Sequence, residues 1–147
     1  SKINTITQLN VSNSAIKDLT GIQDFAQLTD LYCNQNQLTA LNISKNTFLK
    51  TLDCNNNKIE NLDVSKNIAL DTLSSYSNRL TALNVKINKA LKKLDCGSNQ
   101  ISTLDVSANT DLIFFFCNTS LLTTLDVSKN TLWPSSLAPR MKSSPLK

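Results

Sequence analysis

The chain has 147 residues, an apolar fraction of 40% and a net charge of +4, as expected for one globular domain with a single core. Residues 134–147 hold three basic side chains and no acid, and the remaining 12 basic and 11 acidic side chains nearly balance. No concentrated basic face is therefore available for nucleic acid. No apolar run reaches the roughly 20 residues of a membrane helix, so no membrane insertion is expected.

The first unit of the chain begins at Ile6 and is 22 residues long. Its apolar residues are spaced as the interior of one coil of a repeat protein would require. They are Leu9, Val11, Ile16, Leu19, Ile22 and Phe25.

Five further repeats follow without a gap, because an opening leucine recurs every 21 residues. The repeats start at Leu28, Leu49, Leu70, Leu91 and Leu112. Each repeat has apolar residues at positions 1, 4, 6, 11, 14 and 16, and Ser75 is the only polar residue at these thirty positions. Such a period indicates a solenoid, in which each coil buries its apolar side only by stacking on the next.

Alternation of apolar and polar residues around positions 4 and 6 predicts a strand that buries one side. A second alternation, at positions 14 and 16, predicts another short extended segment. No segment has the ten or more residues of helical periodicity that a sizeable helix needs. We therefore expect six rungs of parallel strand, about 4.8 Å apart, joined mostly by turns.

The segments LKTLDCNNNKI and LDTLSSYSNRL fit the L-x-x-L-x-L-x-x-N-x-L core, and they resemble the leucine-rich-repeat family. IKDLTGIQDFAQLTDL is similar to internalin-type repeats, and LDVSKN resembles short repeats of bacterial surface and secreted proteins. The resemblance implies a right-handed leucine-rich-repeat solenoid, α/β by family but here with little helix. It covers residues 1–133, and we expect residues 134–147 to form an irregular or disordered tail.

Two columns of asparagine occupy the bends and explain how a chain with 2 glycines can turn so often. One column is Asn36, Asn57, Asn78 and Asn99, broken by Ser120, and the other is Asn46, Asn67, Asn88, Asn109 and Asn130. Asparagine tolerates positive φ, and its amide can satisfy backbone groups. Sugar binding by these residues is the weaker interpretation, because ladder positions face inward in this family.

The sequence holds no arrangement typical of catalysis, and we expect neither a cofactor nor a metal. There is no histidine, which removes serine or cysteine triads and the usual zinc sites. The four cysteines all occupy position 6, where we expect buried free thiols. At position 15 single carboxylates mostly alternate with amide side chains, a spacing that favours a solvated polar face over a calcium site. That column comprises Asn42, Asp63, Asn84, Asp105 and Asp126.

The outward side chains at positions 3, 5 and 7 vary in chemistry, whereas the interior hardly changes. Family members bind partners on this concave side. The candidate binding residues are Asp30, Tyr32, Thr51, Asp53, Ser74, Tyr76, Lys93, Asp95, Phe114 and Phe116. Phe114 and Phe116 have two alternative roles, binding a partner or capping the end of the solenoid.

These patterns predict a non-enzymatic binding module for a protein or glycan partner, from a bacterial surface or secreted protein. An intracellular regulatory scaffold, such as a phosphatase-binding leucine-rich-repeat protein, is the alternative. One face of this size gives a small interface, so we expect a monomer or weak oligomer.

Overall fold

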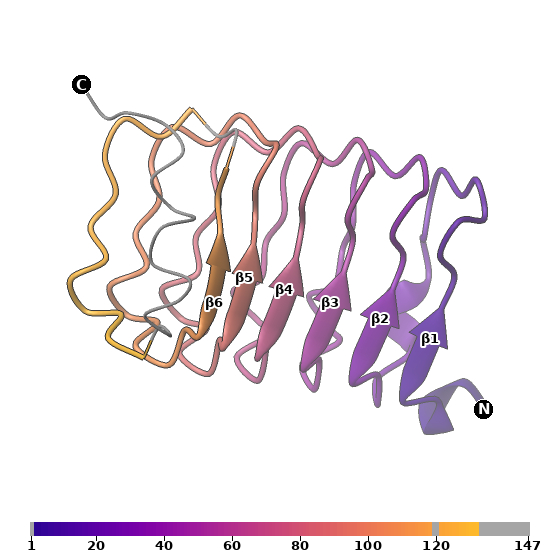
Figure 1. Ribbon diagram of the computed structural model, residues 1–147. Helices are drawn as coiled ribbons and strands as arrows, with labels where there is room; N and C mark the ends of the chain where they lie inside the picture. The colour runs from indigo at the N-terminus through magenta and orange to yellow at the C-terminus, as the bar shows by residue number, and fades with distance from the viewer. Residues whose placement is uncertain (1, 119–120, 133–147) are drawn as a thin grey trace.

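The computed structural model describes residues 2–118 and 121–132 (Figure 1). The described part consists of short parallel strands joined by turns, with two short 3-10 helices near the N-terminus. In chain order the elements are η1 (Lys2–Thr5), β1 (Gln8–Asn10), η2 (Ile22–Asp24), β2 (Asp30–Tyr32), β3 (Thr51–Asp53), β4 (Thr72–Ser74), β5 (Lys93–Asp95) and β6 (Phe114–Phe116).

The strands form one parallel sheet in the order β1-β2-β3-β4-β5-β6, so every coil lies next to the coil that precedes it in the chain (Figure 1). Leu31 is in register with Leu52, and Leu52 is in register with Leu73. The same alignment continues through Leu94 to Phe115. This confirms the predicted solenoid, in which equivalent side chains stack in columns.

The core lies inside the coils and is built from those columns. The side chains of Leu52, Leu73 and Leu94 are fully buried. Leu41 and Ile43 are also buried, as the second alternation predicted. The described residues form no hydrogen-bonded strand at positions 14 to 16, so the coils pair as a sheet on one side only.

The first asparagine column holds adjacent coils together. Asn57 Nδ2 donates to the carbonyls of Cys33 at 3.0 Å and Cys54 at 3.1 Å, and Asn57 Oδ1 accepts the backbone N–H of Leu38 at 2.9 Å. One side chain therefore satisfies three backbone groups that would otherwise be unpaired at the bend.

The expectation that the asparagine columns adopt positive φ is wrong. Next to the first column, positive φ falls one residue earlier, where the φ angles lie between 51 and 55°, and the asparagines of the second column have no positive φ. These residues are Gln35, Asn56, Ser77 and Ser98. Because the following asparagine supplies the hydrogen bonds of the bend, we infer that the left-handed position tolerates residues other than glycine.

The predicted break at Ser120 and the predicted tail at 134–147 lie outside the described residues. In the part of the chain that is described, no helix has the length and hydrophobicity needed to cross a bilayer.

Candidate functional site

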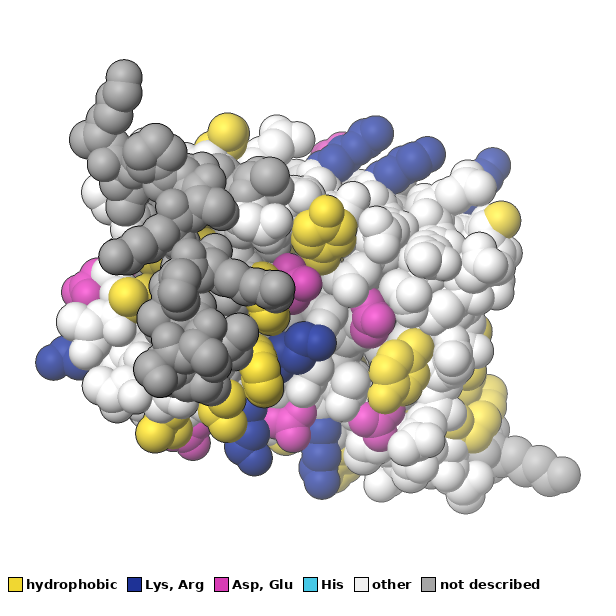
Figure 2. Space-filling view, viewed as in Figure 1, with side chains coloured by type: hydrophobic (Ala, Val, Ile, Leu, Met, Phe, Trp, Pro, Cys, Tyr) yellow, Lys and Arg dark blue, Asp and Glu magenta, His cyan; other side chains and the backbone are white. Residues whose placement is uncertain are grey.

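The candidate site is the strand face, defined as the outward side chains at positions 3, 5 and 7 of the repeats on β2 to β6. Figure 2, viewed from the same side as Figure 1, shows acidic, basic and hydrophobic side chains interspersed over these strands. The sheet register brings nine of the ten predicted binding residues together in two columns at positions 3 and 5, which Thr72 completes, and the tenth, Tyr76, lies at position 7. Those columns are Asp30, Thr51, Thr72, Lys93 and Phe114, and Tyr32, Asp53, Ser74, Asp95 and Phe116.

The column at position 5 has an almost symmetrical order of chemistry. Tyr32 pairs with Asp53, Asp53 with Ser74, and Ser74 with Asp95, which pairs with Phe116. The two ends of the column are thus aromatic residues. A carboxylate comes next to each of them, and the shortest side chain, that of Ser74, lies at the centre.

Ser74 corrects one expectation, because it is 6% exposed and not a solvated position. Its side chain is shorter than the carboxylates of Asp53 and Asp95 on the two adjacent strands. Ser74 therefore lies below the level of its neighbours and forms the floor of the strand face. Gly97 on the same face is also buried.

The carboxylates of Asp53 and Asp95 are half-buried and held in the same way. Asp53 Oδ1 accepts the backbone N–H of Asn55 at 3.1 Å, and Asp95 Oδ1 accepts that of Gly97 at 3.2 Å. Burial raises the pKa of both carboxyls, although these N–H donors and the charge of Lys93 act against it. The negative charge of Asp53 raises the pKa of Asp95 further.

Asp30 differs from these two residues because its charge is stabilised by the protein. Its Oδ2 accepts hydrogen bonds from Thr29 Oγ1 at 2.8 Å and Gln8 Nε2 at 3.3 Å. Burial acts to raise the pKa of Asp30, but hydrogen bonds from Thr29, Thr51 and Gln8 together bring it below the ordinary value.

Four aromatic side chains border these acids. Tyr32, Tyr76 and Phe116 are half-buried, and Phe114 is 43% exposed. Phe115, between the two outward phenylalanines, is buried with the core, so the predicted alternation holds. The residues expected to cap this end lie outside the described ranges, and both roles of Phe114 and Phe116 remain predictions.

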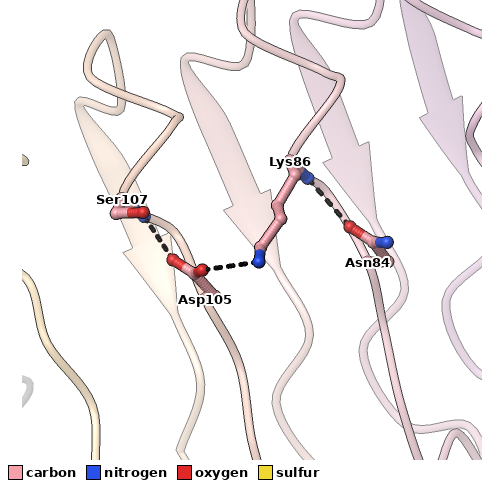
Figure 3. Close-up of polar contacts among 4 residues, drawn as sticks. All are labelled: Asn84, Lys86, Asp105 and Ser107. Carbon is pink, nitrogen blue, oxygen red and sulfur yellow. Dashed lines mark hydrogen bonds and ion pairs between the residues drawn. The ribbon is translucent and has the colours of Figure 1, made fainter.

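A second polar region lies on the opposite side of the coil, at positions 15 and 17 (Figure 3). It borders a shallow, open depression of about 640 Å³. Asp105 Oδ1 accepts the backbone N–H of Ser107 at 2.9 Å, and Lys86 Nζ lies 3.1 Å from the other carboxylate oxygen of Asp105. Hydrogen bonds from the side chain of Ser107, from its backbone N–H and from Lys86 lower the pKa of Asp105 to about 2.

Every residue at position 15 accepts a hydrogen bond from the backbone N–H two residues later. This column therefore organises a turn in each coil. Within the described ranges, no group of three or more cysteine or acidic residues is arranged to hold a metal ion. Sequence reasoning treated the column as a solvated polar face, and the alternation of aspartate and asparagine gave no sign of its role in the turn.

The cysteine column lies in the core. Cys33, Cys54 and Cys96 are buried free thiols, and Cys117 is half-buried. Burial raises the pKa of Cys33 to about 12 and also raises that of the other three. The thiolate form needed for nucleophilic attack is therefore disfavoured, and the column is chemically a set of small apolar side chains.

Comparison with known proteins places this arrangement among bacterial leucine-rich repeats. No protein-family model matches the chain. A stretch of 43 residues, 29% of the chain, is 46% identical to Internalin J of Listeria monocytogenes serotype 4b (strain F2365) and covers 5% of that protein.

The solved functional domain of InlJ from Listeria monocytogenes, which includes a cysteine ladder, superimposes with a TM-score of 0.88 at 40% identity. The alignment covers 89% of this chain and 29% of that one. A leucine-rich-repeat protein of Leptospira interrogans aligns with a TM-score of 0.80 at 24% identity, covering 89% of this chain and 36% of the other. At that identity the likeness concerns the fold alone.

The chain spans less than a third of the InlJ domain that it matches, and it repeats that domain's stacked-coil architecture. The register of six parallel strands, the aligned leucine columns and the asparagine ladders agree with this likeness. The chain is a leucine-rich-repeat solenoid that is similar in sequence and in fold to the InlJ domain.

Proposed function

We propose that the chain is a non-enzymatic binding module that engages a protein or glycan partner through the strand face. The observation that supports this proposal most is the contrast between the two sides of each strand. Inward side chains repeat from coil to coil, whereas the outward ones include half-buried carboxylates and aromatic rings. Partly desolvated charges and rigid aromatic groups are typical of binding anchors.

The proposed setting is a secreted or surface-displayed bacterial protein. The supporting observation is the likeness to internalins, which are surface or secreted proteins. For the alternative, an intracellular scaffold, free thiols are one supporting feature, because the cytosol is reducing. Burial raises the pKa of these thiols and makes them unreactive in either compartment, so the free thiols do not distinguish the two settings.

The size of the strand face sets the expected strength of binding. Five rungs, β2 to β6, spaced about 4.8 Å apart give a face roughly 20 to 25 Å long. An interface of that length falls at the small end of stable protein complexes. We therefore propose that the module is a monomer or weak oligomer, with avidity from neighbouring repeats in a longer parent protein.

The test uses ligands selected from a displayed peptide library and from a glycan array. The triple variant Tyr32→Ala/Tyr76→Ala/Phe116→Ala should bind the selected ligands with an affinity lower by about tenfold or more, because it loses the aromatic contact area. The matched control is Phe48→Ala/Ile68→Ala/Ile87→Ala. It removes three apolar side chains that are 50 to 61% exposed and lie outside the strand face, and it should leave affinity within about twofold. Equal effects of the two variants would contradict the proposal.

A further inference from the structure

The centre of the strand face contains an acidic notch, defined here as Asp53, Ser74 and Asp95. The three residues lie side by side on β3, β4 and β5. Neighbouring strands are about 4.8 Å apart, so the two aspartate backbones are separated by roughly 10 Å with the short serine between them. This geometry leaves room for a side chain from outside to lie between two carboxylates.

Each carboxylate presents one oxygen that the protein does not use. Oδ1 of Asp53 and Oδ1 of Asp95 accept backbone N–H groups, which fix the orientation of both side chains. Across residues 2–118 and 121–132, neither Oδ2 has a hydrogen bond, and neither carboxylate has an ion pair within 4.0 Å. The two charges are therefore preoriented but not neutralised by contact.

Ser74 provides a second and independent indication of a ligand. Only 6% of its surface is exposed, and it occupies the outward column between the two acids. Its hydroxyl has no hydrogen bond to any described residue. The hydroxyl oxygen is not fully enclosed, so a donor from outside the chain can reach it.

The net charge of the strand face, which contains the notch, is opposite in sign to the net charge of the whole chain. The strand face has three carboxylates and one ammonium group, a net charge of −2, whereas the whole chain has a net charge of +4. Tyr32 and Phe116 lie beyond the two acids in the same column. Aromatic faces next to carboxylates suit a planar cation, which can stack on a ring while it donates to an oxygen.

We propose that the acidic notch receives one arginine side chain of a protein partner. The guanidinium donates to the unused oxygens of Asp53 and Asp95, and Ser74 Oγ accepts a further N–H. Arginine suits this role better than lysine, because its planar group has five donors that can reach acceptors on both sides. The inference rests on the proposed binding function of the strand face, and it names the partner as a protein with an exposed basic residue.

The test is a titration of isotope-labelled protein, followed by amide NMR shifts, with the blocked peptide Tyr-Arg-Tyr. The matched ligand has citrulline in place of arginine, which keeps the shape and removes the charge. We expect the arginine peptide to shift the amides of residues 53, 74 and 95 and to bind about tenfold more tightly than the citrulline peptide. Equal binding of the two peptides, or no shift at these amides up to about 10 mM peptide, would overturn the proposal.

Two variants separate the notch from the fold. Asp53→Asn/Asp95→Asn keeps the Oδ1 acceptors and should reduce arginine-peptide affinity by about tenfold. Asp63→Asn/Asp126→Asn makes the same change in charge at exposed turn residues with the same type of N–H contact. The affinity of that control for the arginine peptide should stay within about twofold of the affinity of the unmodified protein. Equal effects of the two pairs would also overturn the proposal.

Ser74→Lys tests whether the notch must be empty for binding, because it places an ammonium group of the chain between the two carboxylates. It should abolish the binding of the arginine peptide. If the selected ligands depend on the aromatic residues but not on the notch acids, the notch proposal fails and the strand-face function stands. If they depend on neither set, both proposals fail.

Discussion

The side-chain amide of Asn67 donates to the backbone carbonyl of Asn46, one coil earlier, at 2.8 Å and to that of Ile43 at 3.1 Å. The equivalent pair of hydrogen bonds is made by Asn88, Asn109 and Asn130. These amides are buried. Each coil is thereby tied to the preceding coil at the turn that leads into the next strand.

Asn67→Ala should destabilise the solenoid by about 2 to 4 kcal/mol, because it leaves two buried carbonyls without their donors. Urea unfolding followed by circular dichroism measures the change. Asn84→Ala is the control, since Asn84 is exposed and accepts a single hydrogen bond, from Lys86 N at 3.1 Å. The control should lower the free energy of unfolding by about 1 kcal/mol or less. Similar losses in both variants would show that the buried ladder has no special role.

Ser75→Cys should be tolerated, with a change in the free energy of unfolding within about 1 kcal/mol. Ser75 is fully buried in the cysteine column, and its hydroxyl donates to the carbonyl of Asp95 at 3.2 Å. Cys54 makes the equivalent contact, from its Sγ to the carbonyl of Ser74, at 3.5 Å. A sulfur atom therefore already occupies the same environment one coil earlier.

Ser75→Leu is the matched comparison for that column. A larger side chain overfills a closely packed interior and should destabilise by about 1 to 3 kcal/mol or more. Thermal unfolding of both variants provides the measurement. A loss of several kcal/mol in Ser75→Cys would show that the serine hydroxyl is required, contrary to the assignment of this column as small and apolar.

The fold could be predicted from the sequence because each interior column presents one environment repeated from coil to coil. Leu52, Leu73 and Leu94 are identical and equally spaced, and burial of one in a stacked array implies burial of the others. The period fixed the register, and the structure confirms it. The strand face was located by the same reasoning, as the outward half of each alternation.

The details of the site could not be predicted, because they depend on neighbours across the sheet. Ser74 and Asp53 occupy equivalent positions, yet only Ser74 is buried, since its exposure depends on the height of the side chains beside it. The pattern also did not reveal which bend residue adopts positive φ. Gln35 and Ser77 have no shared chemistry that would indicate it.

Gly97→Ala should destabilise the protein by about 1 to 3 kcal/mol through crowding. A Cβ at this position would lie 2.5 Å from Asn118 Oδ1 and 2.9 Å from the backbone carbonyl oxygen of Asn118. Only the first contact can be relieved by a side-chain movement. Gly97 does not have positive φ, so the predicted loss comes from space and not from backbone strain.

A double-mutant cycle with Asn118→Ala isolates that contact. The loss caused by Gly97→Ala should be smaller in the Asn118→Ala background, because one of the two close atoms is gone. Urea unfolding of the four proteins gives the coupling energy. Additive effects would mean that the Asn118 side chain moves aside without cost and that the backbone contact alone limits this position.

The notch acids and the turn acids should affect stability with opposite signs. Burial raises the pKa of Asp53 and Asp95, so the folded state binds their protons more tightly than the unfolded state. Their charges therefore destabilise the fold at neutral pH, and this effect fades as the pH falls through the raised values. Hydrogen bonds from Ser65 and Ser128 lower the pKa of Asp63 and Asp126. The stability from these two charges is present above the unfolded pKa and is lost as the pH falls through the lowered values.

Thermal unfolding between pH 3 and pH 7 can test this contrast. Asp53→Asn/Asp95→Asn should unfold at a higher temperature than the unmodified protein at pH 7, and the difference should shrink toward pH 3. Asp63→Asn/Asp126→Asn should unfold at a lower temperature at pH 7. Side chains that are kept although they reduce stability are typical of functional sites. If the notch variant is instead the less stable protein at pH 7, the two carboxylates support the fold, and the reason to assign them to a partner is removed.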